Sequence, residues 1–222
     1  NAYQPQFFWS FLIILALLSA GRLRKNFAGK MFRLGSKGFN KKELLVIAVA
    51  VISLAIWLYG AISFTTGSDV ITYHYPFVKE CIKLKHFGHN ITLPFGDDRI
   101  STYNPALVHM LFLVGKLLSD DRAANLINWL SQVLLLMAIY VFSRDFISRS
   151  AAFMAVAIYF GFSVVFLYAV DVSNYAAQSV FMLTSLYCIF LYNKTNSKRC
   201  LILAGILMGF MLSTKYYGLQ LM

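Results

Sequence analysis

Charged residues are scarce in this chain of 222 residues, and acidic ones are the scarcest. Only 13% of the residues are charged, nine of them Asp or Glu, whereas 59% are hydrophobic. A soluble domain carries about a quarter charged residues. The shortage of charge therefore excludes a soluble globular domain and predicts an integral membrane protein with several spans.

Cysteine is also rare, with three scattered copies. Cys81, Cys188 and Cys200 form neither a disulfide framework nor a zinc-binding spacing, so free thiols are expected. The apolar run 7–21 has no basic segment before it and no clear cleavage site after it, which argues against a secretory signal peptide. Because the chain begins without Met and stops just after an apolar run, we expect a longer parent protein.

The net charge of +11 would suggest a nucleic-acid partner in a soluble protein, but the positions of the charges argue otherwise. Eight Lys or Arg residues lie between Arg22 and Lys42, with apolar runs on both sides. This is the pattern of a cytoplasmic loop under the positive-inside rule, where anionic lipid heads are natural neighbours. No nucleic-acid partner is predicted.

The long hydrophobic runs predict an all-α fold, a polytopic transmembrane helical bundle. A helix needs about 20 apolar residues to cross a bilayer. Runs of about that length occupy 3–23, 44–63, 123–142, 151–170 and 175–192, and a sixth begins at Leu201 and continues to residue 219. The run 105–118 is shorter, opens with Asn-Pro and contains Lys116, so it is expected to be re-entrant or interfacial.

With this topology, basic residues are in excess on the inner side of the membrane and balanced by acids on the outer side. The inner segments 21–43, 144–149 and 194–199 hold thirteen basic residues and two acids, and the outer segments 64–122, 171–174 and 213–219 hold seven of each. This asymmetry is what orientation by positive loops requires. The long outer loop includes the stretch 77–85, whose apolar residues alternate with lysines as in a helix lying along the membrane surface.

Two acids stand at predicted helix ends on the outer side. Asp69 follows a span by a few residues and Asp171 lies at another helix end. Ionisable residues at a membrane boundary are costly and often mark a substrate path or a reacting group. Partial burial would also tune a carboxylate for general-base work. The alternative is helix capping, for which Asp, Ser and Asn are well suited.

Other polar residues extend the candidate site. His74, between Tyr73 and Tyr75, is either a hydrogen-bond donor to a phosphate or sugar or part of an interfacial aromatic belt. Lys215 is either a phosphate ligand or a snorkelling anchor. A divalent metal is a weaker alternative: no residue is assigned as a metal ligand, and His86-x-x-His89 has no strong ligand spacing. No cofactor is assigned with certainty.

Four stretches resemble one family in order and spacing: GSDVITYHYPF, YNPALVHMLFLVGKLLSDDRAANLINWLSQVLLLMAIYVFSRDF, YAVDVSNYAAQSVF and GILMGFMLSTKYYGL. Together they resemble the N-terminal module of GT-C membrane glycosyltransferases. The nearest group is the bacterial one related to lipid-A aminoarabinose transferases and protein O-mannosyltransferases. The resemblance covers roughly residues 44–222. Residues 1–43 are then an extra N-terminal span plus a basic cytoplasmic loop, ahead of a module truncated at its C-terminus.

The resemblance implies an inverting transfer of a sugar from a polyprenyl-phosphate donor to a lipid, glycan or protein acceptor. It implies Asp69 as the base and Asp171 as the acid of the second outer loop. Lys215 and Tyr216 would line the donor phosphate region, and Lys215 or Arg99 would stabilise the departing phosphate. Protein O-mannosyltransferases have an Asp-Glu pair where Val70 follows Asp69 here, which argues against protein mannosylation specifically.

The predicted location is a bacterial inner membrane, with the site facing the periplasm or exterior. Two other functions stay open. A non-catalytic scaffold in a larger membrane complex would tolerate loss of both acids. A transporter of a lipid-linked substrate would use the acids for binding, but it should show paired internal repeats, and no clear repeat is present.

Overall fold

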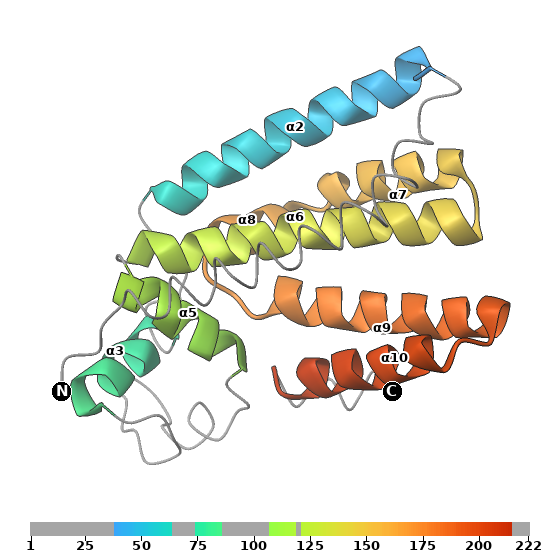
Figure 1. Cartoon of the computed structure of the whole chain (residues 1–222). Helices are drawn as coiled ribbons and strands as arrows, with labels where there is room; N and C mark the ends of the chain where they lie inside the picture. Colours follow the sequence, from blue (N-terminus) through green and yellow to red (C-terminus); the bar gives the residue numbers. More distant parts are fainter. Residues whose placement is uncertain (1–37, 64–73, 86–106, 119–120, 215–222) are drawn as a thin grey trace. The chain divides into compact units, whose positions relative to one another are not determined.

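The computed structural model describes residues 38–63, 74–85, 107–118 and 121–214, and every regular element in those ranges is an α-helix (Figure 1). Three helices are long and apolar enough to cross a membrane: α2 (Lys41–Ile62), α6 (Asp121–Phe146) and α9 (Tyr175–Thr195). At 1.5 Å per residue, α2 and α9 each extend about 32 Å, which matches a hydrocarbon core of about 30 Å. The predicted all-α membrane bundle is confirmed.

Contacts divide the chain into two units, Asn1–Leu45 and Val46–Met222. Within the first unit, Asn40 and Glu43 form a capping box at the start of α2. The Asn40 side-chain oxygen accepts from the Glu43 amide at 2.8 Å, and the Glu43 carboxylate accepts from the Asn40 amide at 2.9 Å. The predicted span 3–23 lies outside the described residues, and the predicted domain boundary after residue 43 stays a prediction.

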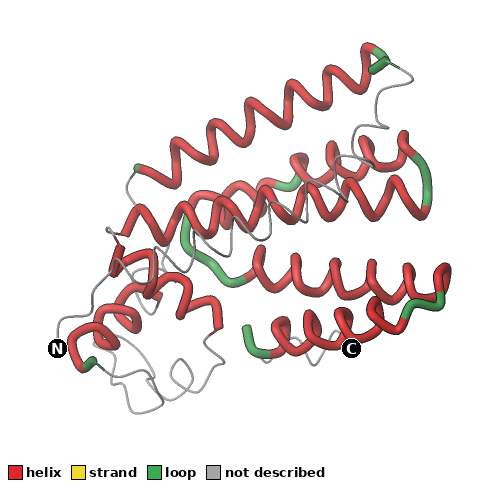
Figure 2. Tube along the Cα trace, in the orientation of Figure 1, coloured by secondary structure: helices red, strands yellow, loops and turns green. Residues whose placement is uncertain are grey.

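The apolar run 151–170, which the sequence predicted as one span, is divided into two helices. It forms α7 (Arg149–Gly161) and α8 (Ser163–Val170), which meet at an angle of 74° (Figure 2). Gly161 ends the first helix, and Phe162 adopts an extended backbone with ψ 112°. Glycine is a weak helix former, so a break here is inexpensive. Hydropathy predicted the apolar character of the run but not its continuity.

Two short helices occur where the outer loop was expected to carry them. α5 (Leu107–Leu118) has 12 residues and extends about 18 Å, too short to span. α3 (Tyr75–Leu84) is amphipathic, but its apolar face is buried in protein rather than facing lipid. Its residues Tyr75, Phe77, Val78 and Cys81 share a hydrophobic cluster with Val108 and Phe112 of α5, Ala124 of α6, Val172 of the α8–α9 connection and Ala177 of α9.

The remaining helix, α10 (Lys198–Leu212), packs against α9 as an antiparallel hairpin (Figure 1). Asn196 makes the sharp turn with a left-handed φ of 52°, a conformation that Asn tolerates better than most residues. The buried Ser185 hydroxyl donates to the Ala204 carbonyl at 2.9 Å and ties the two helices together. The predicted extension of this last apolar run to residue 219 lies outside the described residues.

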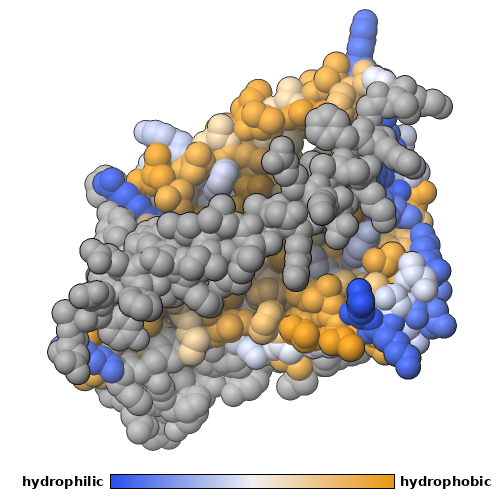
Figure 3. All heavy atoms as spheres, in the orientation of Figure 1, coloured by the Kyte–Doolittle hydropathy of each residue, from blue (hydrophilic) through white to orange (hydrophobic). Residues whose placement is uncertain are grey.

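A second hydrophobic cluster joins α2, α6, α7 and α8 through Trp57, Leu136, Val156 and Ala169. Many large apolar side chains nevertheless stay exposed, most densely along α2, where Leu45, Ile52 and Tyr59 are more than half exposed. Figure 3 shows such hydrophobic surface together with hydrophilic groups near helix ends. An exposed apolar surface of this kind is suited to lipid rather than water.

Candidate functional site

The structure describes two of the seven predicted site residues, His74 and Asp171. The other five lie outside the described residues: Asp69, Tyr73, Arg99, Lys215 and Tyr216. The two that are described lie close to one hydrophobic cluster, because their chain neighbours Tyr75 and Val172 are both members of it. The structure therefore brings the surroundings of His74 and Asp171 to the same end of the bundle.

Asp171 lies between α8 and α9, at a position that ends a helix rather than beginning one. It is the C-cap of α8, with an extended backbone of ψ 149°, and it is half-buried. The N-cap of α9 is Asn174, whose side chain makes no capping hydrogen bond. The N-capping alternative raised by the sequence thus does not describe how Asp171 is held.

Asp171 is held instead by an amide of α6. The Asn128 side-chain Nδ2 donates to the Asp171 carbonyl oxygen at 2.6 Å and to the Tyr168 carbonyl oxygen at 2.8 Å. The Ser173 hydroxyl lies 3.3 Å from Asn128 Oδ1 and 3.3 Å from the Tyr168 carbonyl oxygen, so it can donate to either one, and the contact with Oδ1 matches an amide whose donor faces Asp171. Asn128 is only 1% exposed. Both ends of one buried amide are therefore used to fix the 168–173 segment.

Asn128 belongs to a row of three buried amides along one face of α6. One turn earlier, Asn125 Nδ2 donates to the Ala61 carbonyl at 2.9 Å, and its Oδ1 accepts from the Tyr75 hydroxyl at 3.0 Å. One turn later, Gln132 donates to the Tyr168 carbonyl at 3.2 Å. Ala61 and Tyr75 are described residues on either side of the chain segment that contains Asp69.

This amide row is a structural feature beside the candidate site that the sequence analysis missed. Its signal was present as Asn125, Asn128 and Gln132, spaced by three and four residues within an apolar helix. That spacing places the three side chains on one helical face. Amides in a membrane span are costly unless they are hydrogen-bonded, so such a row indicates partners on neighbouring helices.

His74 lies just before α3 and is paired with His109 of α5. Its Nδ1 lies 2.9 Å from His109 Nε2, the two ring planes are 26° apart, and both residues are buried. Phe112 contacts both imidazoles edge-on. A hydrogen bond between two ring nitrogens needs one of them unprotonated, so the pair carries at most one positive charge. His74 is thus buried and joins the start of α3 to α5.

Two further contacts lie at this end of the bundle, one of them made by a charged side chain. The Lys116 ammonium lies 4.6 Å from the centre of the Tyr75 ring. The Leu107 amide donates to the Ser213 carbonyl at 3.1 Å, which joins the start of α5 to the end of α10. Lys215 follows Ser213 by two residues in the sequence. Among the described residues, no three His, Cys, Asp or Glu side chains gather as metal ligands.

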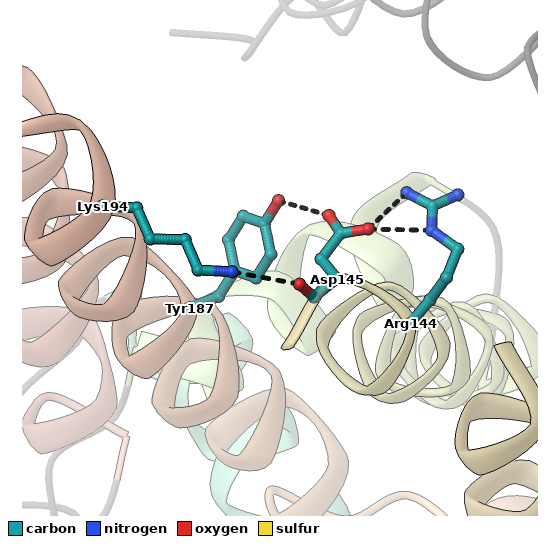
Figure 4. Close-up of polar contacts among 4 residues, drawn as sticks. All are labelled: Arg144, Asp145, Tyr187 and Lys194. Carbon is teal, nitrogen blue, oxygen red and sulfur yellow. Dashed lines mark hydrogen bonds and ion pairs between the residues drawn. The ribbon is translucent and has the colours of Figure 1, made fainter. Parts of the chain in front are cut away.

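The opposite end of the bundle holds another acid, Asp145, in a different setting (Figure 4). Its carboxylate accepts from the Arg144 guanidinium at 2.8 Å and from the Tyr187 hydroxyl at 2.9 Å, and its carbonyl accepts from Lys194 at 3.2 Å. These contacts join the α6–α7 turn to the end of α9. Asp145 therefore links α6 to α9 at the protein surface, next to the basic residues Arg144 and Lys194.

The sequence profile of the family described as dolichyl-phosphate-mannose-protein mannosyltransferase matches residues 102–222. The match covers Asp171, Lys215 and Tyr216 but begins after Asp69, Tyr73, His74 and Arg99. No curated protein and no solved structure matches this chain.

Proposed function

The chain belongs to the dolichyl-phosphate-mannose-protein mannosyltransferase family, and on that premise we propose that it moves a sugar from a polyprenyl-phosphate donor to a membrane-associated acceptor. The family membership confirms the resemblance to GT-C glycosyltransferases and makes the protein an integral membrane glycosyltransferase. Its donor, acceptor and mechanism are the proposal.

The proposed reaction is a direct displacement at the anomeric carbon. An acceptor hydroxyl attacks the face opposite the phosphate, a new bond forms between the acceptor oxygen and the anomeric carbon, and the bond from that carbon to the phosphate oxygen breaks. The electron pair leaves with polyprenyl phosphate, and the acceptor proton passes to the carboxylate of Asp69. The configuration is inverted. Negative charge grows on the departing phosphate, which cations such as Lys215 or Arg99 would stabilise.

One observation carries the proposal for the site: Asp171 is anchored through its carbonyl to a buried amide within the region that matches the family. A carboxylate on a fixed segment is suited to hold a sugar or an acceptor in one geometry, since orientation supplies much of the rate in such reactions. Tyr73 and Tyr216 complete the proposed substrate contacts. For His74, the proposed role is to set the start of α3 through His109.

The proposed location is a bacterial inner membrane, with the site on the periplasmic or exterior face. The basic residues support this orientation. Arg144, Arg149 and Lys194 lie at the end of the bundle where Asp145 joins α6 to α9, and Asp171 lies toward the opposite end of α6. The positive-inside rule would place the basic end in the cytoplasm.

The test is transfer from a defined donor. The chain is reconstituted in vesicles with radiolabelled polyprenyl-phosphate mannose and membranes of the expression host as acceptor source, and label in the acceptor fraction is measured. Asp69→Asn and Asp171→Asn should each lower transfer by about 100-fold or more, as loss of a general base or an orienting carboxylate does.

Asp145→Asn is the matched control, because it removes one carboxylate from the same chain at the other end of the bundle. It should leave transfer within about twofold of wild type, since a surface ion pair contributes little. Full transfer by Asp69→Asn would remove that residue as the base. Equal losses in all three variants would indicate a general effect on the fold.

A further inference from the structure

The side chain of Asn128 makes its hydrogen bonds to one segment, residues 168–173. It is almost fully buried at the middle of an interhelical contact, and both of its polar atoms point to the connection between α8 and α9. Its Nδ2, which has two hydrogens, donates to the carbonyls of Tyr168 and Asp171, and the Ala169 carbonyl oxygen lies 3.5 Å away. The shortest of the three contacts, 2.6 Å, goes to Asp171.

These carbonyls need a partner for a physical reason. α8 ends at Val170, and the last carbonyls of a helix have no amide within the helix to accept from. In an apolar surrounding such groups are expensive unless something donates to them. At the end of α8, amides of α6 supply donors in place of the missing helical hydrogen bonds. Of the two described amides, Gln132 donates to the Tyr168 carbonyl, and Asn128 donates to the Asp171 carbonyl as well.

We propose that Asn128 is a positioning residue of the transferase site, which holds the carboxylate of Asp171 in its working place by anchoring the Asp171 backbone. This inference rests on the proposed function. Asn128 touches no reacting atom in this account, and it acts through Asp171. Ser173 is its partner, because the hydroxyl of Ser173 contacts Oδ1 of an amide whose donor faces the Asp171 carbonyl.

The experiment compares Asn128→Leu with Gln132→Met in the full chain in lipid nanodiscs. Each variant removes one buried amide from the same face of α6 and one donor to the Tyr168 carbonyl, but only Asn128 contacts Asp171. Hydrogen exchange over 171–174 is measured first, since it needs no activity. Asn128→Leu should speed that exchange by about fivefold or more, as loss of one or two hydrogen bonds does, and Gln132→Met should not.

Transfer from polyprenyl-phosphate mannose is measured on the same samples. Asn128→Leu should lower kcat by about 10- to 100-fold, with the donor KM within about twofold of wild type, because a displaced group costs rate more than binding. Ser173→Ala should shift both readouts in the same direction by a smaller factor. If Asn128→Leu does not fold, Ser173→Ala tests the anchoring of Asp171 in its place.

Equal exchange at 171–174 in Asn128→Leu and Gln132→Met would overturn the anchoring. Faster exchange with unchanged kcat would overturn the positioning role while leaving the proposed function intact. A wild-type chain that transfers nothing would contradict the proposed function and, with it, any catalytic use of the anchor. The hydrogen-exchange result would then still report whether Asn128 fixes the loop.

Discussion

At the scale of single residues, this protein shows how few polar groups a membrane helix needs to organise its neighbours. Asn125 and Asn128 each offer a donor and an acceptor from one short side chain, and each uses both. An interhelical hydrogen bond in a membrane contributes only about 0.6 kcal/mol on average. The larger effect is to avoid leaving the ends of α2 and α8 with unsatisfied carbonyls.

Cys81 provides a prediction at the same scale. Its side chain is buried on α3, and burial raises the pKa of the thiol from its ordinary value of 9.0 to about 11. Only the thiolate reacts readily, so alkylation of Cys81 by iodoacetamide at pH 8 to 9.5 should be at least about tenfold slower in the folded chain than in denaturant. Peptide mass spectrometry measures both rates, and Cys200, which is partly exposed, serves as the internal comparison.

The same shift predicts a pH effect on stability. A raised pKa means that the folded state favours the neutral thiol. The contribution of Cys81 to the free energy of unfolding is therefore complete below about pH 9 and is lost as the pH rises toward 11. Equal alkylation rates for Cys81 in the folded and denatured chain would show that α3 does not stay packed in its hydrophobic cluster.

At the scale of helices, close approach depends on glycines other than those that the sequence pattern suggests. Gly205 and Gly209 form a G-x-x-x-G pattern, yet no described atom lies within 4 Å of a Cβ built on either. Gly60 of α2 and Gly115 of α5 are the crowded ones. A Cβ on Gly60 would lie 2.5 Å from Val170 Cγ1. Among the described residues, the crowded glycines are therefore Gly60 and Gly115 and not those of the G-x-x-x-G pattern.

Gly60→Ala tests this contact between α2 and α8. Valine is stiff at χ1 and cannot easily move aside, so the substitution should destabilise the chain by about 1–3 kcal/mol, the usual cost of overpacking. Unfolding in mixed detergent and SDS, followed by circular dichroism, gives the free energy. Gly205→Ala is the control, since Gly205 also lies inside a helix and nothing lies within 4 Å of its added Cβ.

Val170→Ala combined with Gly60→Ala completes a double-mutant cycle. The pair should be more stable than the sum of the single effects predicts, because the smaller side chain makes room for the new methyl group. Additive effects would mean that Gly60 matters for a reason other than its distance from Val170.

The elements also show where sequence reasoning succeeded. Long apolar runs predicted α2, α6 and α9, and the short run with Lys116 predicted a helix that does not span. The bend between α7 and α8 was missed because hydropathy averages over a window, whereas the break is a local feature at Gly161 and the extended backbone of Phe162. The roles of Asp69 and Asp171 stay predictions, since a residue type at a helix end does not reveal what it faces.

At the scale of the whole molecule, the described residues of Val46–Met222 have two chemically different ends. One end joins the α6–α7 turn to the end of α9 through Asp145 and carries Arg144, Arg149, Lys194, Lys198 and Arg199. The other end collects the buried histidine pair, the loop with Asp171 and the contact between α5 and α10. A polarised bundle of this kind fits one orientation in a membrane.

That orientation gives the last prediction. Lys83 of α3 has a side chain that is 72% exposed at the histidine end, and Lys198 is exposed at the basic end. In a Cys200→Ser background, Lys83→Cys should react with a membrane-impermeant maleimide added to the periplasmic side of intact cells. Lys198→Cys should react only after the inner membrane is made permeable, because the positive-inside rule places that end in the cytoplasm. Cys81 and Cys188 are buried and provide the unreactive background in both variants.

The reverse pattern would move the proposed site to the cytoplasmic face, where a donor and acceptor would have to be sought instead. Labelling of both cysteines from outside would contradict the assignment of α6 and α9 as spans between these two ends.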